Sequence, residues 1–419
     1  MKEKLLNYIE ENKAELFRTL CEMVDINTEN SGTGGNEAPL AAYMRRHFTA
    51  LGLESEVYSP DDVPGVLSHP EYLPGRNLAD RPNVTARLCG TAPKKSLLLA
   101  GHLDTVPVGD LSLWETPPTK GVQKDGRIYG RGANDDKFAL AIEMFLAKAF
   151  SVLGIKLKND VYLAGYVDEE FGGGNGALAL CVKYPVDFAI NMDSDYMDAF
   201  HCGVGGQRLF VRLRHPEPQD SCNVMLEGLY LAKAEIDKFG ARRRAEMAEN
   251  SYFKGTDIPA KALRYMNIVS GTQTNDRHLG ILDFAFYTDR DSAVIEAELA
   301  TLAADIAKAV APLGLVVDCM TPRSRLFRYA ATDKAHPEIL RLCRHVEKEA
   351  GKHPRICGMC LSDLNIFINN LGGNAVGMGV CRDFADEGGA HQPNEYVDCV
   401  ELLRFTKAIA SYILEWDEV

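Results

Sequence analysis

Residues that could bind a metal ion or transfer a proton follow several short apolar runs of the sequence. In chain order they are His102 and Asp104, Glu169 and Glu170, Asp193 and Asp195, and His391. A further group, Gly130 to Lys137 (GRGANDDK), opens an apolar stretch and contains the adjacent pair Asp135 and Asp136. Imidazole nitrogens and carboxylate oxygens are common zinc ligands, and the same groups act as general acids and bases. Each group alone is weak evidence, because such short matches arise freely by chance.

The four apolar runs are 96–100, 161–167, 188–192 and 374–379, and each has the length and composition of a buried strand. In an open α/β sheet the carboxyl ends of the strands lie at one edge, where ligands bind. We therefore expect the acidic residues and the histidines to meet there. Buried carboxylates that repel one another need cations, so the sequence predicts two divalent metal ions, zinc first, with cobalt or manganese as alternatives.

The stretch 137–150 is expected to be a helix that Asp135 and Asp136 precede. An aspartate at this position caps exposed main-chain N–H groups. Capping needs only one of the two aspartates, so the other carboxylate is available for a functional role.

Helical stretches alternate with the strand runs, beginning with a helix at 4–24 and ending with one at 400–413. This alternation predicts an α/β fold with a mixed, largely parallel sheet covered by helices. Between 207 and 320 the order changes to strand, helix, strand, strand, helix, strand, which predicts an inserted α+β unit of the split-βαβ type. We expect a discontinuous catalytic metal-binding domain at 1–206 and 321–419, interrupted by a smaller domain at 207–320.

Composition excludes several classes of protein. The 419 residues carry 46 Lys and Arg against 59 Asp and Glu, a formal net charge of −13, which disfavours nucleic acid or an anionic membrane as partner. The charged start, MKEKLLNYIEENKAELF, is unlike a signal peptide, so we expect a cytoplasmic protein with reduced thiols. Cys357 and Cys360 have the spacing of half a zinc site or of a redox motif, but no second pair lies nearby.

Five motifs together resemble a known family. GHLDT, GRGANDDK, DEEFG, the Asp193 region and AHQPNE occur in the order found in the co-catalytic zinc metallohydrolases, which include aminoacylase, carboxypeptidase G, succinyl-diaminopimelate desuccinylase, acetylornithine deacetylase and the dinuclear-zinc dipeptidases. The resemblance spans essentially the whole chain. It implies a zinc-exopeptidase type of fold and hydrolysis of the amide bond of a small peptide or an N-acyl amino acid.

The resemblance also implies a role for each residue. One metal would be held by His102, Asp135 and Asp193, and the other by Asp135, Glu170 and His391, so that Asp135 bridges them. Asp104 would be the carboxylate that fixes the tautomer of His102, and Glu169 would be the general base. These roles suit attack by a metal-bound hydroxide on an amide carbonyl.

The sequence departs from the family at two of these places. Relatives often have Glu-Pro-Thr where this chain has Asp193-Ser194-Asp195, so Asp195 is an alternative ligand. Phe138 replaces a glycine that often follows the lysine of the second motif.

The inserted domain is similar to the family's lid and dimerisation domain. By that resemblance His215 and Asn275 would reach the substrate, and an arginine would grip its free carboxylate. Arg290, Arg323, Arg325 and Arg328 are the candidates, with Arg290 taken first. An exposed strand edge in such a domain is often covered by a second copy, so we expect a homodimer.

Three other interpretations stay open at this point. The protein could be an N-acyl amino acid deacylase rather than a peptidase. It could be a binding protein that kept the fold without the chemistry, although every ligand and base position is filled. A redox or zinc-ribbon protein built on Cys357 and Cys360 is the third.

Overall fold

The computed structural model describes residues 1–217, 219–270 and 276–418, and the chain folds into two compact units. The first comprises Met1–His201, Ala331–Cys357 and Ile366–Val419, and the second comprises Cys202–Ala330 and Gly358–Asn365. The division thus lies close to the expected boundaries at 206/207 and 320/321. The short segment 358–365, which belongs to the second unit, carries no sequence signal of that membership.

The main sheet has a parallel centre with antiparallel strands on either side. Its order is β1-β2-β6-β3-β7-β15-β8-β13, with β14 paired to β8. Strands β6, β3, β7 and β15 run parallel, whereas the β1–β2, β2–β6 and β15–β8 pairs are antiparallel. The strands are β1 (Glu54–Tyr58), β2 (Asn83–Leu88), β3 (Ser96–His102), β6 (Asp160–Tyr166), β7 (Phe188–Asn191), β8 (Ala199–Gly203), β13 (Ala330–Ala331), β14 (Ile356–Met359) and β15 (Ala375–Gly377). The predicted fold class is confirmed.

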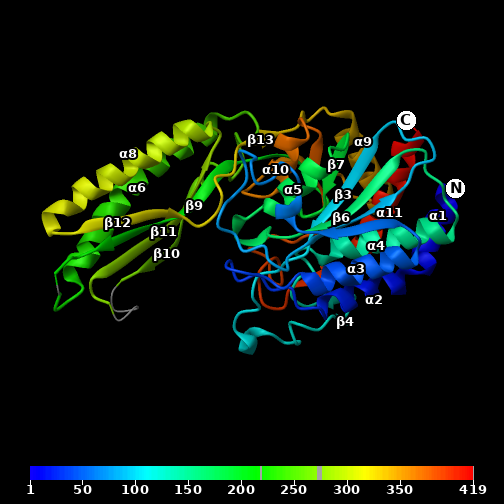
Figure 1. Cartoon of the computed structure of the whole chain (residues 1–419), viewed down its shortest axis with the longest axis horizontal. Helices are drawn as coiled ribbons and strands as arrows, with labels where there is room; N and C mark the ends of the chain where they lie inside the picture. The colour runs from blue at the N-terminus through cyan, green and yellow to red at the C-terminus, as the bar shows by residue number, and fades with distance from the viewer. Residues whose placement is uncertain (218, 271–275, 419) are drawn as a thin grey trace. The chain divides into compact units, whose positions relative to one another are not determined.

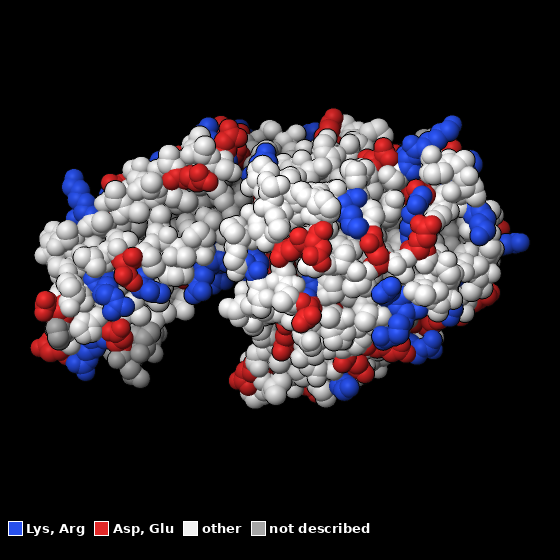
Figure 2. All heavy atoms as spheres, viewed as in Figure 1, with Lys and Arg blue, Asp and Glu red and all other residues white. Residues whose placement is uncertain are grey.

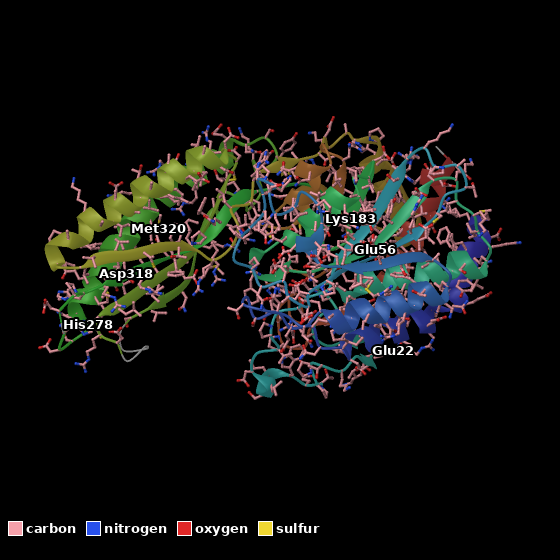
Figure 3. The ribbon with its side chains drawn as sticks, viewed as in Figure 1. Glu22, Glu56, Lys183, His278, Asp318 and Met320 are labelled. Atoms are coloured by element: carbon pink, nitrogen blue, oxygen red, sulfur yellow. The ribbon has the colours of Figure 1, made fainter. Side chains whose placement is uncertain are left out.

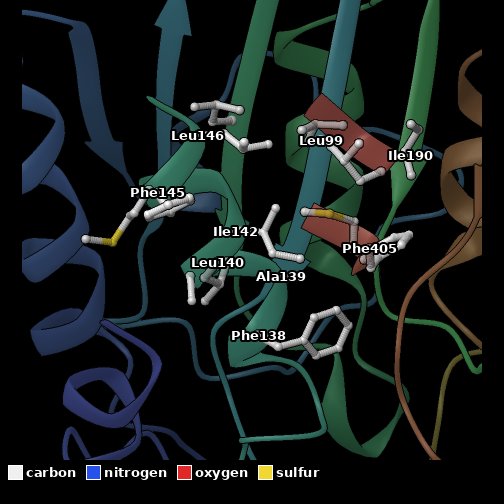
Figure 4. Packing of buried hydrophobic residues seen from close by; sticks show 14 of the residues in the cluster. Leu99, Phe138, Ala139, Leu140, Ile142, Phe145, Leu146, Ile190 and Phe405 are labelled. Carbon is white, nitrogen blue, oxygen red and sulfur yellow. The ribbon is translucent and has the colours of Figure 1, made fainter. Parts of the chain in front are cut away.

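Helix α4 (Lys137–Val152) forms the centre of the core. It is mostly apolar and almost completely buried, because β3 and β6 lie on one side of it and helices α1, α2, α3 and α11 lie on the other. Figure 4 shows its side chains Ile142 and Leu146 near Leu99 of β3. The other helices of this unit are α1 (Lys2–Glu11), α2 (Lys13–Val24), α3 (Ala38–Ala50), α5 (Asn175–Lys183), α9 (Pro337–Ala350) and α11 (Cys399–Glu418); α10 (Leu364–Asn370) begins at the boundary with the second unit (Figure 1).

One predicted helix is wrong in detail. The stretch 4–24 forms two helices, α1 and α2, which are separated at Asn12. There the Asn12 side chain and main-chain N–H both donate to the carbonyl of Tyr8 (2.8 and 2.9 Å). Asparagine side chains compete with the helical ladder in this way, which explains the break.

A small sheet that the sequence did not indicate joins two distant motifs. Its order is β16-β5-β4, from β4 (Val122–Lys124), β5 (Arg127–Tyr129) and β16 (Tyr396–Asp398). Strand β5 ends where the GRGANDDK motif begins, and β16 starts directly after the AHQPNE motif. The antiparallel pairing, in which Tyr396 faces Tyr129, therefore brings the two motifs together.

The second unit has the predicted order of elements. A four-stranded antiparallel sheet, β10-β11-β9-β12, carries α6 and α8 on one face (Figure 1). The elements are β9 (Gly205–Arg214), α6 (Asn223–Glu249), β10 (Leu263–Val269), β11 (Leu279–Thr288), α8 (Ser292–Val310) and β12 (Val316–Pro322). Strand β9 alternates buried and half-buried residues, as a sheet with one covered face requires.

Acidic and basic side chains are interspersed over the face shown in Figure 2. Within the described ranges, none of the helices combines the length and the apolar character needed to cross a bilayer. The structure has all eleven cysteines as free thiols.

Candidate metal centre

The carboxylate of Asp135 lies between two histidines. His102 Nε2 is 2.8 Å from Asp135 Oδ1, and His391 Nε2 is 3.2 Å from Asp135 Oδ2. Glu170 Oε2 lies 2.9 Å from the same His391 nitrogen. Ligand atoms of His102, Asp135 and Glu170 all lie within 4.8 Å of one another. The structure thus brings together four residues from separate parts of the chain, each at the end of an element or in a loop.

His102 is the last residue of β3 and is fully buried. Its Nδ1 lies 2.8 Å from the main-chain oxygen of Asp104, which can only accept, so Nδ1 must carry a proton. In the neutral ring the lone pair of Nε2 then points at Asp135. Two electron-rich atoms at this distance require a positive charge between them, supplied by a proton or by a metal ion. The donor set therefore fits a cation.

Charges in this cluster perturb one another strongly. Burial opposes a charged ring, but Asp135 outweighs it and raises the pKa of His102 well above its usual value. Burial likewise opposes a charge on His391, yet Glu170 and Asp135 raise its pKa to about 11. Burial raises the pKa of Glu170, whereas hydrogen bonds from both histidines hold the pKa of Asp135 well below its normal range despite burial. Such mutual perturbation is typical of functional sites.

Asp193 and Asp195 follow β7 at the same edge of the sheet. Burial, and then the charge of Asp135, raise the pKa of Asp193 to about 7, while His102 and His391 act in the opposite direction. Burial raises the pKa of Asp195 to about 7 as well, and the charges that act on it next are Asp193, Asp383 and Asp135. The histidine charges thus act on Asp193 and are not among the main influences on Asp195.

Asp104 lies next to the site, but the main hydrogen-bond partners of its carboxylate are groups other than His102. Its nearer oxygen is 3.8 Å from His102 Nδ1, farther than the main-chain oxygen. The carboxylate instead accepts the main-chain N–H groups of Glu169 (3.2 Å) and Glu170 (3.1 Å) and the side-chain amide of Asn30 (2.8 Å). The main chain of Asp104 therefore orients His102, while its side chain holds the segment that carries both glutamates.

Neither aspartate of the pair at 135–136 caps α4, contrary to our expectation. Asp136 occupies the N-cap position without a side-chain capping bond, and its Oδ2 accepts the main-chain N–H of His102 at 3.2 Å. The peptide bond between Asp135 and Asp136 is cis. Both carboxylates are directed toward His102 rather than toward the helix.

Arg81 is the centre of a buried ionic network next to Asp104, which the sequence did not indicate. Arg81 is 1% exposed; its Nη2 lies 2.6 Å from Glu37 Oε1 and its Nη1 lies 3.1 Å from Asp168 Oδ1. Arg81 Nη2 is also 3.9 Å from Asp104, and Arg76 pairs with Asp168 at 2.5 Å. The only sequence signal was the position of Asp168 directly before Glu169, because Glu37, Arg76 and Arg81 lie in loops or at a helix start far from any motif.

Two of the predicted substrate residues, His215 and Arg290, lie in the second unit. His215 follows β9 and accepts the main-chain N–H of Glu217 at Nδ1 (3.1 Å), and its own N–H donates to the carbonyl of His278, which is labelled in Figure 3. Arg290 pairs with Glu246 at 3.2 Å and is 58% exposed. Asn275 lies outside the described residues. Of the other arginine candidates, Arg325 is buried and Arg323 stacks over the ring of Phe210 (4.7 Å).

Cys357 lies in β14, and burial raises the pKa of its thiol to about 12. Within the described ranges, neither it nor Cys360 belongs to a group of three metal-ligating side chains. A zinc ribbon at this pair thus has no structural support.

The pattern that defines peptidase family M20/M25/M40 matches residues 98–415. Among characterised relatives, N-formyl-4-amino-5-aminomethyl-2-methylpyrimidine deformylase of Halalkalibacterium halodurans is 31% identical over 285 residues, 67% of this chain and 56% of that protein. The chain spans about half, or less, of the length of the first curated relatives that it matches.

Solved structures with the same fold include a di-peptidase of Saccharomyces cerevisiae, with a TM-score of 0.77 and 16% identity over 100% of this chain and 99% of that one. A dinuclear metal-binding peptidase of Bacillus subtilis matches with a TM-score of 0.57 and 11% identity, over 98% of this chain and 99% of that one. These two likenesses concern the fold alone.

The ionic network gives a prediction for stability. Replacing Arg81 by methionine leaves the buried carboxylate of Glu37 without its counter-charge and removes one of the two positive charges near Asp168, so we expect the free energy of unfolding to fall by about 3–5 kcal/mol. Arg87→Met removes a half-exposed pair with Asp160 and serves as control, with an expected loss of about 1 kcal/mol or less. Urea unfolding measures both. Equal losses in the two variants would show that the buried network does not carry this stability.

Proposed function

Because this chain belongs to peptidase family M20/M25/M40, we propose that it is a dinuclear metal-dependent hydrolase that cleaves the amide bond of a small peptide or an N-acyl amino acid. The observation that carries the proposal is the position of the Asp135 carboxylate. One of its oxygens lies 2.8 Å from His102 Nε2, and the other lies 3.2 Å from His391 Nε2. A carboxylate that faces two separate nitrogens in this way is placed to bridge two ions.

We assign one metal to His102, Asp135 and Asp193 and the other to Asp135, Glu170 and His391. Asp193 is taken as the ligand, as the family resemblance implies, and Asp195 is the alternative. The mixed nitrogen and oxygen donors suit zinc, with cobalt or manganese as alternatives. When bound, such a pair supplies Lewis-acid activation of water and of the amide carbonyl.

Glu169 is proposed as the general base. Its main-chain N–H is held by Asp104, and its half-buried side chain lies close enough to influence the pKa of His102. In this role its carboxylate takes a proton from the attacking water and delivers it to the leaving nitrogen. Glu170, whose Oε1 is fixed by the N–H of Val106 at 3.1 Å, is left to bind metal through Oε2.

A deacylase is the second candidate, and the relative from Halalkalibacterium halodurans favours it, because its name describes removal of a formyl group from an amine. In either case His215, Asn275 and Arg290 are proposed substrate contacts. Arg290 would need to exchange Glu246 for the substrate's carboxylate, as its exposed guanidinium permits.

The substrate class is tested by a screen for released amine over dipeptides, tripeptides and N-acyl amino acids, with the metal content measured in parallel. We expect two divalent ions per chain and activity on at least one of these groups. Complete chelation should abolish that activity, and readdition of zinc should restore it. Full activity of the chelated protein would contradict the proposal.

The base is tested by Glu169→Gln, which keeps the shape of the side chain and removes its proton acceptor. We expect unchanged metal content and a loss of kcat of about 10²–10⁴-fold. Glu29→Gln serves as control, because the Glu29 carboxylate accepts the N–H of Val108 and is assigned no part in the mechanism, and this variant should retain activity. Near-normal kcat in Glu169→Gln would remove this residue from the mechanism.

We also propose a homodimer formed through the second unit. Its edge strands β10 and β12 expose apolar residues, namely Met266, Ile268 and Val316. Sedimentation at micromolar protein should give twice the chain mass of 46.2 kDa. A species of 46.2 kDa would contradict the dimer.

Cytoplasmic location stays a prediction.

A further inference from the structure

Glu395 is a completely buried glutamate four residues after His391. Its Oε1 accepts three main-chain N–H groups, those of Gly132 (2.9 Å), Asn134 (2.9 Å) and Asp135 (3.1 Å). Its Oε2 accepts a hydrogen bond from the guanidinium of Arg131. One carboxylate thus gathers the whole turn that leads into Asp135.

The same pair of loops is tied together by further bonds. The main-chain N–H of Gly130 donates to the carbonyl of Glu395 (2.9 Å), next to the pairing of β5 with β16. Arg131 Nη2 donates to the main-chain oxygen of His391 at 3.3 Å. Arg131 therefore contacts both Glu395 and His391, and its side chain is only 5% exposed.

These contacts determine how far Asp135 lies from His391. The Asp135 main chain is bound to Glu395, and the His391 main chain is bound to Arg131, the ion-pair partner of Glu395. His391 has a left-handed backbone conformation (φ 63°). For a residue other than glycine this conformation is costly, and it persists only where the surrounding structure imposes it. The pair thus imposes one geometry on two residues that no regular element holds.

We propose that Glu395, together with Arg131, is a positioning residue that sets the spacing of Asp135 and His391 and thereby the affinity of the site for its metal ions. This inference rests on the proposed function, because it concerns the metal centre assigned there. A pair that served only to hold two loops together would affect the stability of the fold and leave metal affinity unchanged.

The test is a titration of the chelated protein with Co²⁺, in which the visible absorption of the bound ion measures binding. For Glu395→Gln we expect the affinity for at least one of two cobalt ions to fall by about 10- to 100-fold, with an altered spectrum, as for other residues that support metal ligands. The amide keeps the size of the side chain but loses the charge that Arg131 requires.

Asp417→Asn is the matched control. Asp417 is also a buried carboxylate, its Oδ1 accepts the main-chain N–H groups of Lys158 (2.7 Å) and Asn159 (2.8 Å), and it lies in α11, away from the motifs. We expect this variant to lose stability but to bind cobalt like the wild type.

Each outcome decides. Wild-type cobalt affinity in Glu395→Gln overturns the inference, and so does an equal loss in Asp417→Asn, because the effect would then follow from stability alone. If Glu395→Gln does not fold, Arg131→Lys replaces it, since a lysine cannot reach both Glu395 and His391 with a planar fork. Failure of both variants to fold also overturns the inference, because the pair would then determine the fold. Wild-type protein that binds no cobalt refutes the proposed function itself.

Discussion

Negative charge is concentrated at the carboxyl edge of the parallel strands, and the rest of the structure is arranged to make that concentration tolerable. Asp135 and Glu170 are buried there, and Asp193 is half-buried beside them. The cost of burying like charges shows in the raised pKa of Glu170 and Asp193. Only positive charge placed among them can offset that cost, and the two histidines supply part of it.

Two buried networks of ion pairs and hydrogen bonds support this cluster. In the first, Arg76 and Arg81 neutralise Asp168, and Arg81 approaches Asp104, whose carboxylate in turn holds the main chain of the two glutamates. In the second, Glu395 and Arg131 bind the loops of Asp135 and His391. Apart from His102 at the end of β3, the proposed ligand residues lie outside the long helices and strands, so these supports replace the rigidity that such an element would give. Preorganisation of this kind is what a metal-dependent hydrolase needs in order to bind its ions with a fixed geometry.

The sequence was sufficient for the features that depend on local patterns. Apolar runs predicted the parallel strands, and the position of His102 and Glu170 directly after two of them predicted their meeting at one edge. The supports depend on long-range pairing, which no local pattern contains. Arg81 precedes a proline in a loop and reaches Glu37 from there, and Glu395 was part of a quoted motif without any sign that it would bind a turn 260 residues earlier. The group that fixes the tautomer of His102 was predicted incorrectly, because the main-chain oxygen of Asp104 lies closer to Nδ1 than its carboxylate does.

The central claim is that Asp135 bridges two metal ions, one on the side of His102 and the other on the side of His391. Anomalous diffraction at the zinc absorption edge, from crystals of protein purified without chelators, tests it most directly. The account predicts two anomalous peaks, both in contact with Asp135, of which one contacts His102 and the other contacts His391. A single peak, or two peaks of which either fails to contact Asp135, would contradict it.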